Sequence, residues 1–297
     1  MNEIILNEMR SFLFDRTSLE TLPDSIWKRT AALNTWGTNA IEGSTISYDD
    51  AQRILLDHLT PDGKPIADVT ETLQHERAFR GLMNRRQREI SLITMQELHE
   101  EVFRTIKPDA GQWRRANVRI TGARFAPPRM EKVLPQIERW ARTYNDRDIT
   151  GENAFTLGAW MHFEFERIHP FSDGNGRVGR LLLNLHFVKR NWPPVHVLPM
   201  HRHDYLAGLN SAAEGDAEPL AGLLKVLMGS SLLDLLDQVG TSEDELISLK
   251  DASKKSPYSA QYLALRCKQG ELPAIKERGE WRTSGRALGV YREYVGR

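Results

Sequence analysis

Two strongly apolar helical segments joined by a short glycine-rich stretch constrain the fold of this chain more than any other feature. In the first segment, residues 154–168, the large apolar residues recur at helical spacing and predict a face buried in a core: Leu157, Trp160, Met161, Phe165 and Ile168. The second segment, residues 177–190, is largely apolar, and the Pro193-Pro194 pair stops it. We therefore expect two adjacent central helices and a mainly α fold.

The rest of the chain adds helices and a small amount of β structure. Residues 92–106 predict another amphipathic helix, and residues 118–125 alternate apolar and polar residues around a turn at Thr121-Gly122, which indicates a short β-hairpin. The 297 residues suffice for one large domain or two modest ones. We predict three regions: an N-terminal helical region (1–90), a core (91–240) and a small C-terminal domain (241–297).

Composition narrows the setting in which the chain works. Its single cysteine, Cys267, excludes an internal disulfide and argues against a cysteine-based zinc site. The N-terminal apolar run is short and is interrupted by Glu3 and Glu8, so it does not resemble a signal peptide. No segment is expected to reach the roughly 18 apolar residues that a membrane span needs. We expect a cytoplasmic protein with no membrane partner.

The stretch between the two apolar helices, HPFSDGNGRVGR at residues 169–180, contains the groups needed for chemistry on a phosphate. Gly174 and Gly176 leave backbone N–H groups uncovered at the start of a helix, which is a site for anions. Arg177 and Arg180 lie three residues apart and can bind the same anion. Asp173 is a hard oxygen ligand suited to Mg²⁺. His169 has a side chain that can take a proton from a hydroxyl group.

These twelve residues match the signature of the Fic family position by position. The resemblance extends from about Thr30 to Met228 and includes GQWRRANVRITGARFAPP upstream of the motif. It implies a Fic helical core with a β-hairpin flap, and transfer of AMP from ATP to a Ser, Thr or Tyr hydroxyl of a target protein, which could be the chain itself. The Fic relatives that act as phosphotransferases have Lys where Gly176 stands, so AMP transfer is the favoured reaction.

The resemblance also implies a role for each residue of the motif. His169 would be the base, with Asn175 and Arg177 as further catalytic residues, and Asp173 would hold Mg²⁺. ATP would be bound by the backbone and side chains of the following segment: Gly174, Asn175, Gly176, Arg177 and Arg180. The flap would dock the target by strand addition, through Ile120, Thr121, Gly122, Ala123 and Arg124.

A second, upstream motif resembles the inhibitory pattern of the same family. In TNAIEG, Thr38, Glu42 and Gly43 occupy the three specified positions. A glutamate at a helix end that is terminated by Gly43 can form a forked ion pair with Arg180 and so deny that arginine to the γ-phosphate. The resemblance implies an autoinhibited enzyme, and leaves open that the same glutamate serves removal of AMP from a target. A homodimer is also left open.

The nucleobase site is less well marked. At the positions where family members offer a tyrosine and an asparagine to adenine, alignment without gaps places Leu206 and Ala213. The preference for ATP over other nucleotides therefore rests on the family alone.

The C-terminal region is basic, whereas the rest of the chain is acidic. Residues 250–297 contain 11 Lys and Arg against 5 Asp and Glu, although the whole chain has 40 of each kind. The expected order of helix, turn, helix and hairpin with Gly279 at its tip resembles a winged helix-turn-helix of the MerR or excisionase type. Such a module would bind DNA through the second helix and the wing, through Gln261, Tyr262, Arg266, Lys268, Gln269, Lys276, Arg278 and Arg282. A protein-docking module and a DNA-binding regulator with the core as nucleotide sensor both remain open.

Overall fold

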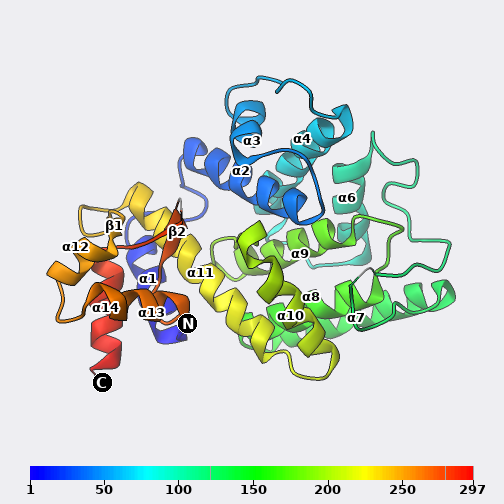
Figure 1. Ribbon diagram of the computed structural model, residues 1–297. Coiled ribbons are helices and arrows are strands. Elements are labelled where there is room, and N and C mark those ends of the chain that lie inside the picture. The colour runs from blue at the N-terminus through cyan, green and yellow to red at the C-terminus, as the bar shows by residue number, and fades with distance from the viewer. Residues whose placement is uncertain (121, 278, 297) are drawn as a thin grey trace. The chain divides into compact units, whose positions relative to one another are not determined.

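The computed structural model describes residues 1–120, 122–277 and 279–296, and confirms a predominantly helical protein with one small sheet. The chain forms two compact units (Figure 1). One comprises Trp27–Asn191 and His196–Leu223, and the other comprises Met1–Ile26, Trp192–Val195 and Leu224–Arg297. The predicted domain boundaries at residues 90 and 240 stay predictions.

The first unit is built almost entirely from α-helices. In chain order they are α2 (Asp24–Ile41), α3 (Tyr48–Leu55), α4 (Ile66–Arg80), α5 (Leu82–Arg85), α6 (Leu92–Phe103), α7 (Val133–Ile149), α8 (Ala154–Ile168), α9 (Asn175–Lys189) and α10 (Arg202–Ala213), with the 3-10 turns η1 (Met130–Lys132) and η2 (Pro199–His201). The two apolar segments of the sequence are α8 and α9, as predicted, and they pack against each other.

Helix α9 is the centre of this unit. Every residue from Arg177 to Val188 is buried, and a helix that is buried on all sides belongs to the middle of a core. Helix α8 begins at the cap residue Asn153, whose side chain accepts hydrogen bonds from the N–H groups of Phe155 and Thr156. Because α8 ends at Ile168 and α9 begins at Asn175, the glycine-rich motif is the tight connection between two core helices.

The predicted β-hairpin is not formed in the described part of residues 118–125. These residues make a turn, with a positive φ of 81° at Gly122 and one backbone hydrogen bond from Ala123 N–H to Ile120 O (3.4 Å). Thr121 lies outside the described residues. The Arg124 N–H group bonds the Asn210 side chain at 3.0 Å instead of a facing strand. Alternation over so few residues is a weak signal for a hairpin, and in the structure the Arg124 N–H group is bonded to a side chain and not to a facing strand.

The second unit contains the sheet. Its elements are α1 (Glu3–Phe14), the part of α11 (Glu218–Val239) from Leu224 onward, β1 (Ile247–Ser248), α12 (Leu249–Lys254), α13 (Ala260–Lys268), β2 (Ile275–Glu277), β3 (Glu280–Thr283) and α14 (Gly285–Val295). The strands are antiparallel in the order β1-β3-β2, with Ile275 opposite Arg282 and a positive φ of 88° at Gly279.

These elements follow the order that the sequence predicts for the basic C-terminal region, including the hairpin with Gly279 at its tip. DNA binding by this region stays a prediction. Two of its cations already have acidic partners, because Arg266 pairs with Glu271 at 2.9 Å and Arg282 with Glu277 at 3.2 Å. Arg278 lies outside the described residues.

Helix α11 departs from the expectation that no segment is long and apolar enough to cross a membrane. By length and composition it meets that test, with a mean hydropathy of 1.5 over its most apolar window. Yet 61% of that window is buried inside the protein, which is the pattern of a core helix.

Candidate active site

His169 stands at the end of α8 in an unusual backbone conformation. It adopts the left-handed region (φ 51°, ψ 62°), and its N–H group closes the helix on Phe165 O at 3.0 Å. The ring nitrogen Nδ1 lies 3.2 Å from the carbonyl oxygen of Glu166. A carbonyl can only accept, so Nδ1 carries the proton and Nε2 is left with a free lone pair. Burial lowers the pKa of His169, which keeps the ring neutral near pH 7.

The loop after His169 is held by a buried arginine that the sequence motif does not contain. Arg114 is 5% exposed and donates from Nε to the carbonyl oxygen of His169 at 2.8 Å. Its own N–H group bonds Pro170 O at 2.9 Å. These bonds fix the backbone on both sides of the His169–Pro170 peptide.

Asn175 braces the same loop from inside. Its side chain accepts from Phe171 N–H at 2.9 Å and donates to Phe171 O at 3.0 Å, and the residue is 1% exposed. Both polar atoms of the amide are therefore engaged with backbone. Asn175 shapes the loop with its side chain, and its N–H group is what it can offer to a ligand.

Gly174 is required by two independent features of the loop. Its φ is +80°, a conformation that other residues rarely adopt. A Cβ atom at this position would lie 2.3 Å from the ring of Phe103. The chain can therefore turn directly into α9, whose first N–H groups have no acceptor within the helix and carry the positive end of its dipole. This helix start is the predicted anion site.

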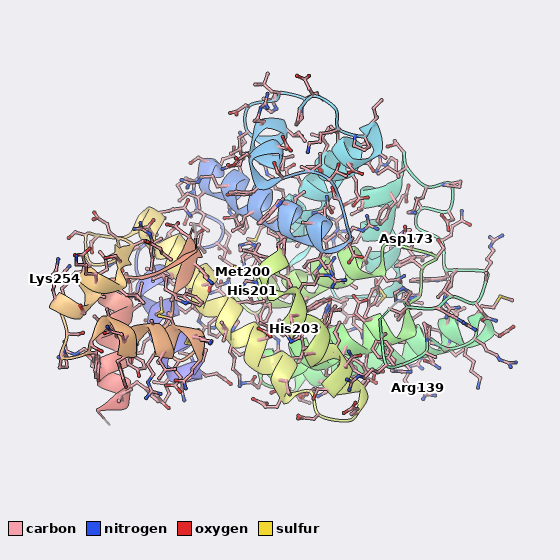
Figure 2. The ribbon with its side chains drawn as sticks, viewed as in Figure 1. Arg139, Asp173, Met200, His201, His203 and Lys254 are labelled. Atoms are coloured by element: carbon pink, nitrogen blue, oxygen red, sulfur yellow. The ribbon has the colours of Figure 1, made fainter. Side chains whose placement is uncertain are left out.

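Asp173 and Arg177 lie beside this anion site, and each is paired with residues of opposite charge. Asp173 is on the exposed loop before α9 (Figure 2), and its carboxylate accepts from Lys107 Nζ at 2.6 Å. Arg177 reaches Asp173 at 3.3 Å and also pairs with Glu71 of α4. Burial would raise the pKa of Asp173, but the bonds from Lys107 and the nearby Arg177 outweigh it and lower the pKa below its usual value.

Glu42 lies where the sequence predicts it, just past the end of a helix. Helix α2 ends at Ile41, and the Glu42 and Gly43 N–H groups close turns on Asn39 O (3.1 Å) and Ala40 O (3.2 Å). Gly43 has φ +94°, the left-handed conformation that ends helices.

Arg180 of α9 receives this glutamate in a fully occupied network. Its Nη2 donates to Glu42 Oε1 at 2.6 Å, and its Nε donates to the hydroxyl of Thr38 at 2.5 Å. Nη1 lies 3.5 Å from the Tyr205 hydroxyl. The expected Glu42–Arg180 contact is therefore present, but with one guanidinium nitrogen and not as a fork, because Thr38 takes the other edge of the guanidinium group.

Glu42 and Arg180 each stabilise the charged form of the other. Burial would raise the pKa of Glu42, but the charge and hydrogen bond of Arg180 outweigh burial and hold that pKa below its usual value. Burial would likewise lower the pKa of Arg180, and Glu42 more than compensates, so the pKa is raised. Both groups are charged at neutral pH.

The Glu42 carboxylate also lies beside Gly176, the second residue of α9. A Cβ atom placed on Gly176 would lie 2.3 Å from Glu42 Oε1 and 3.0 Å from Arg180 Nη1. The absence of a side chain at Gly176 thus gives the carboxylate its place at the start of α9. A ligand that approaches Gly176 from this side would meet the Glu42 carboxylate.

Glu166 is a second acidic residue of the site, and the sequence analysis did not single it out. It is 7% exposed on α8, and burial raises its pKa to about 8. It is therefore mostly protonated at neutral pH. The available signal was its place on the buried face of α8, one residue after the predicted core residue Phe165.

A cavity of about 160 Å³ lies at the site. Its lining includes five residues already described, His169, Gly176, Arg180, Glu42 and Glu166. The other lining residues come from the end of α2, from the predicted flap and the residue after it, and from α10: Ile41, Ile120, Gly122, Ala123, Phe125, Arg202, Tyr205, Leu206, Leu209 and Asn210. Leu206 is thus part of the cavity wall, and Ala213 is not among the lining residues. The volume is below the ~300 Å³ at which pockets begin to hold drug-sized ligands.

Of the predicted residues, the structure brings together His169, Gly176, Arg180, Glu42 and the described flap residues Ile120, Gly122 and Ala123 around one cavity. Arg124 is half of an exposed ion pair with Glu214 at 3.2 Å. Besides Glu166, the residues that sequence reasoning missed come from other helices and loops and have no local pattern: Glu71, Lys107 and Arg114.

Comparison with known proteins agrees with this geometry. Residues 89–187 match the model of the Fic/DOC family. The chain is 30% identical over 254 residues to protein adenylyltransferase fic-1 of Caenorhabditis elegans, covering 84% of this chain and 49% of that protein, and 32% identical over 186 residues to protein adenylyltransferase Fic of Aedes aegypti, covering 60% and 36%. The chain thus spans half or less of the length of these curated relatives.

Solved structures show the same fold. A Fic domain containing signaling protein from Bacteroides thetaiotaomicron superposes with a TM-score of 0.71 at 22% identity, covering 78% of this chain and 97% of that one. Fic-1 (residues 134–508) of C. elegans superposes with a TM-score of 0.68 at 27% identity, covering 79% of this chain and 70% of that one.

Proposed function

We propose that this chain, whose residues 89–187 form a domain of the Fic/DOC family, is a protein adenylyltransferase that transfers AMP from ATP to a hydroxyl group of a target protein. Curated relatives that match most of the chain carry that name. The observation that supports the proposal is that His169, whose Nδ1 bonds the Glu166 carbonyl oxygen, lines the same cavity as Gly176 and Arg180.

His169 would act as the general base. Its Nε2 would accept the proton of a Ser, Thr or Tyr hydroxyl, and the oxygen would attack the α-phosphorus of ATP. The bond from that phosphorus to the bridging oxygen of the β-phosphate would break, and pyrophosphate would leave. The N–H groups at the start of α9, from Asn175 to Arg177, would stabilise the charge that develops on the phosphate.

Asp173 fits a Mg²⁺ site of the kind that is completed by phosphates. Mg²⁺ commonly binds through one or two carboxylates plus substrate oxygens, and the Asp173 carboxylate is half exposed next to the anion site. Among the described residues there is no group of three acidic, His or Cys side chains that could hold a metal alone, which is consistent with that kind of site. When bound, the ion would offset charge on the phosphates.

Glu42 would hold the enzyme in an inhibited state. It engages Arg180 and sits over Gly176, so the γ-phosphate could not reach its arginine and the α-phosphate could not settle on the N–H groups of α9. The segment Ile120–Arg124 would dock the target peptide by strand addition, since its described residues Ile120, Gly122 and Ala123 line the same cavity as His169.

The test is labelling of protein by ATP that carries a label on the α-phosphate, with Mg²⁺ present. Glu42→Gly should increase labelling of the chain or of lysate proteins, and His169→Ala should abolish it. Glu164→Gln, which removes an ion pair with Arg167 on α8, is the matched control and should label as wild type does. Equal labelling by His169→Ala and wild type would rule out the proposed base.

A second reaction at the same site is favoured by the ionised state of Glu42. A charged carboxylate over Gly176 could orient a water molecule toward an AMP-modified target. Under that reading Glu42→Gly would lose the ability to remove AMP from a modified protein, whereas simple inhibition predicts that removal is unaffected. Incubating modified target protein with both forms separates the two reactions.

A further inference from the structure

A larger cavity lies apart from the candidate active site, where α4, α5 and the side of α6 meet. Its volume is about 610 Å³, and it shares no lining residue with the cavity around His169. Four arginines line it, Arg77 and Arg80 at the end of α4 and Arg85 and Arg88 in and after α5, against two glutamates, Glu76 and Glu101. The lining therefore has an excess of two positive charges.

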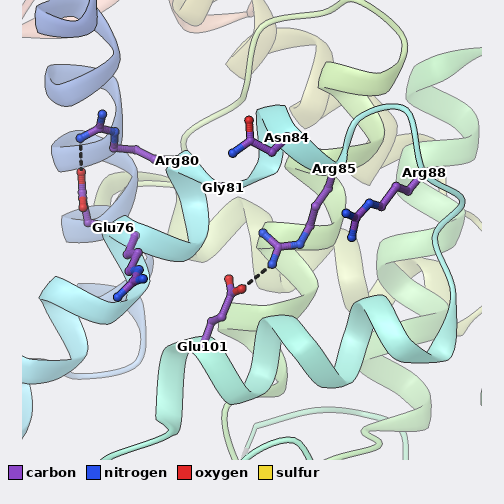
Figure 3. A pocket seen from close by; sticks show the side chains of 8 residues that line it. Glu76, Arg80, Gly81, Asn84, Arg85, Arg88 and Glu101 are labelled. Atoms are coloured by element: carbon purple, nitrogen blue, oxygen red, sulfur yellow. Dashed lines mark hydrogen bonds and ion pairs between the residues drawn. The ribbon is translucent and has the colours of Figure 1, made fainter.

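Two of the arginines already have acidic partners. Arg80 pairs with Glu76 at 3.6 Å, and Arg85 pairs with Glu101, as the dashed lines in Figure 3 show. The second pair holds the Arg85 guanidinium group in place, and its buried Nε, which makes no hydrogen bond in the described structure, lies 3.8 Å from Glu97 Oε2. Arg80 and Arg85 therefore both have carboxylates beside them.

The other two arginines have charges that nothing in the described structure neutralises. Within residues 1–120, 122–277 and 279–296, the side chains of Arg77 and Arg88 make no ion pair with a carboxylate. Both are exposed and line the same cavity. Asn84 adds an exposed amide between them in the sequence (Figure 3). Unpaired guanidinium groups that line one hollow are suited to an anion with several acceptor oxygens.

The lining also restricts the kind of anion. No described residue that lines the cavity is aromatic or a large apolar residue, so it provides no surface on which a nucleobase could stack. A Cβ atom at Gly81 would lie 2.7 Å from Arg85 Nη1, so the missing side chain at Gly81 leaves room for that guanidinium group. We propose that this cavity binds a compact oligophosphate anion, without a contribution from a base, as a second anion site of the protein.

The site goes beyond the proposed transfer reaction, since none of its residues touches the cavity around His169. The two sites nevertheless share helices. Glu71 of α4 pairs with Arg177, and His99 of α6 lies 3.1 Å from the carbonyl oxygen of Asp173 through Nε2. An anion that draws α4, α5 and α6 together would therefore act on the helices that support the motif loop.

The experiment is calorimetric titration of the full chain with inorganic tripolyphosphate at low ionic strength. Arg77→Gln/Arg88→Gln keeps polar, hydrogen-bonding side chains and removes both unpaired charges. We expect wild type to show a class of sites whose affinity falls roughly tenfold or more in this double variant. The control Arg139→Gln/Arg142→Gln removes two exposed arginines of α7 and should bind as wild type does. Circular dichroism melts confirm that each variant is folded.

Three kinds of result would overturn the proposal, the third being a preference for another ligand. The first is equal tripolyphosphate binding by wild type and Arg77→Gln/Arg88→Gln. The second is an equal loss in the α7 control, which would mean diffuse attraction to charge. The third is an ATP affinity at this class of sites far above that of tripolyphosphate, which would assign the cavity to nucleotides, or a far tighter Arg77- and Arg88-dependent binding of long DNA or RNA. Because no step depends on AMP transfer, failure of labelling by ATP would leave these results unaffected.

Discussion

Replacing Glu42 by glutamine separates the charge of this residue from the space that it fills. Glu42→Gln keeps a side chain of the same size over Gly176 but turns the ion pair into a hydrogen bond from the still-charged Arg180 to a neutral amide oxygen. The substitution therefore removes only the attraction between the two charges, which contributes up to about 1 kcal/mol at partly exposed sites. The Glu42 side chain is 33% exposed, and we expect a loss of stability of about 1 kcal/mol.

The free energy that Glu42→Gln loses in stability should reappear as a gain in its affinity for ATP. Wild type must give up the Glu42–Arg180 contact before a triphosphate can reach Arg180, and the variant gives up less. We expect Glu42→Gln to bind ATP about fivefold more tightly, which is the equivalent of about 1 kcal/mol. Urea unfolding measures the first quantity and calorimetric titration with ATP measures the second.

The pH dependence provides an internal check on the cause. The pKa of Glu42 is lowered in the folded protein, so the contribution of its charge to stability is fully present above the ordinary value of 4.5 and is lost as pH falls through the lower folded value. The difference in stability between wild type and Glu42→Gln should therefore shrink on acidification below 4.5. A loss of stability with no gain in ATP affinity, or a gain in affinity with unchanged stability, would refute the reasoning.

Two further substitutions test the loop and the buried acid. Gly174→Ala should destabilise the protein by about 2–4 kcal/mol in urea unfolding, because it combines a left-handed φ with a clash against Phe103. The control is Gly222→Ala in α11, where a Cβ meets nothing within 4 Å, and it should be neutral or stabilise by about 0.5 kcal/mol. Equal effects of the two substitutions would contradict the account of the loop. The pKa of Glu166 is raised from 4.5 to about 8, so its contribution to stability is fully present below 4.5 and is lost as pH rises toward 8. Glu166→Gln should therefore gain about 1–3 kcal/mol more at pH 8 than at pH 5 relative to wild type, and a gain that does not depend on pH would show that Glu166 is ionised throughout.

Much of the site could be predicted from the sequence because its main elements are local. The motif from His169 to Arg180 specifies its own loop through Gly174, and the helices on both sides follow from apolar spacing. The end of α2 at Ile41, with Gly43 in the left-handed conformation, also follows from a short pattern. Chemistry encoded within a few consecutive residues can be read without a structure.

The remainder depends on contacts between distant segments. Arg114 lies 55 residues before the His169 carbonyl that it binds, and Glu71 lies 106 residues before Arg177. No periodicity links such pairs. The forked Glu42–Arg180 pair was predicted from the inhibitory pattern and from the place of Glu42 at a helix end, and only the structure shows that the Thr38 hydroxyl occupies part of the guanidinium group. The hairpin predicted at residues 118–125 is not formed in the described residues, where the Arg124 N–H group bonds the side chain of Asn210, a residue remote in the sequence.

The left-handed turn at His169 has a consequence for how such a protein can be controlled. Because the main chain itself, through the Glu166 carbonyl, decides which ring nitrogen holds the proton, the imidazole is equally ready whether the pocket is shut or open. Under the proposed inhibition by Glu42, the group that accepts the proton and the group that blocks the site belong to different segments of the chain. Loosening the turn after α2 would then release activity with no change at His169.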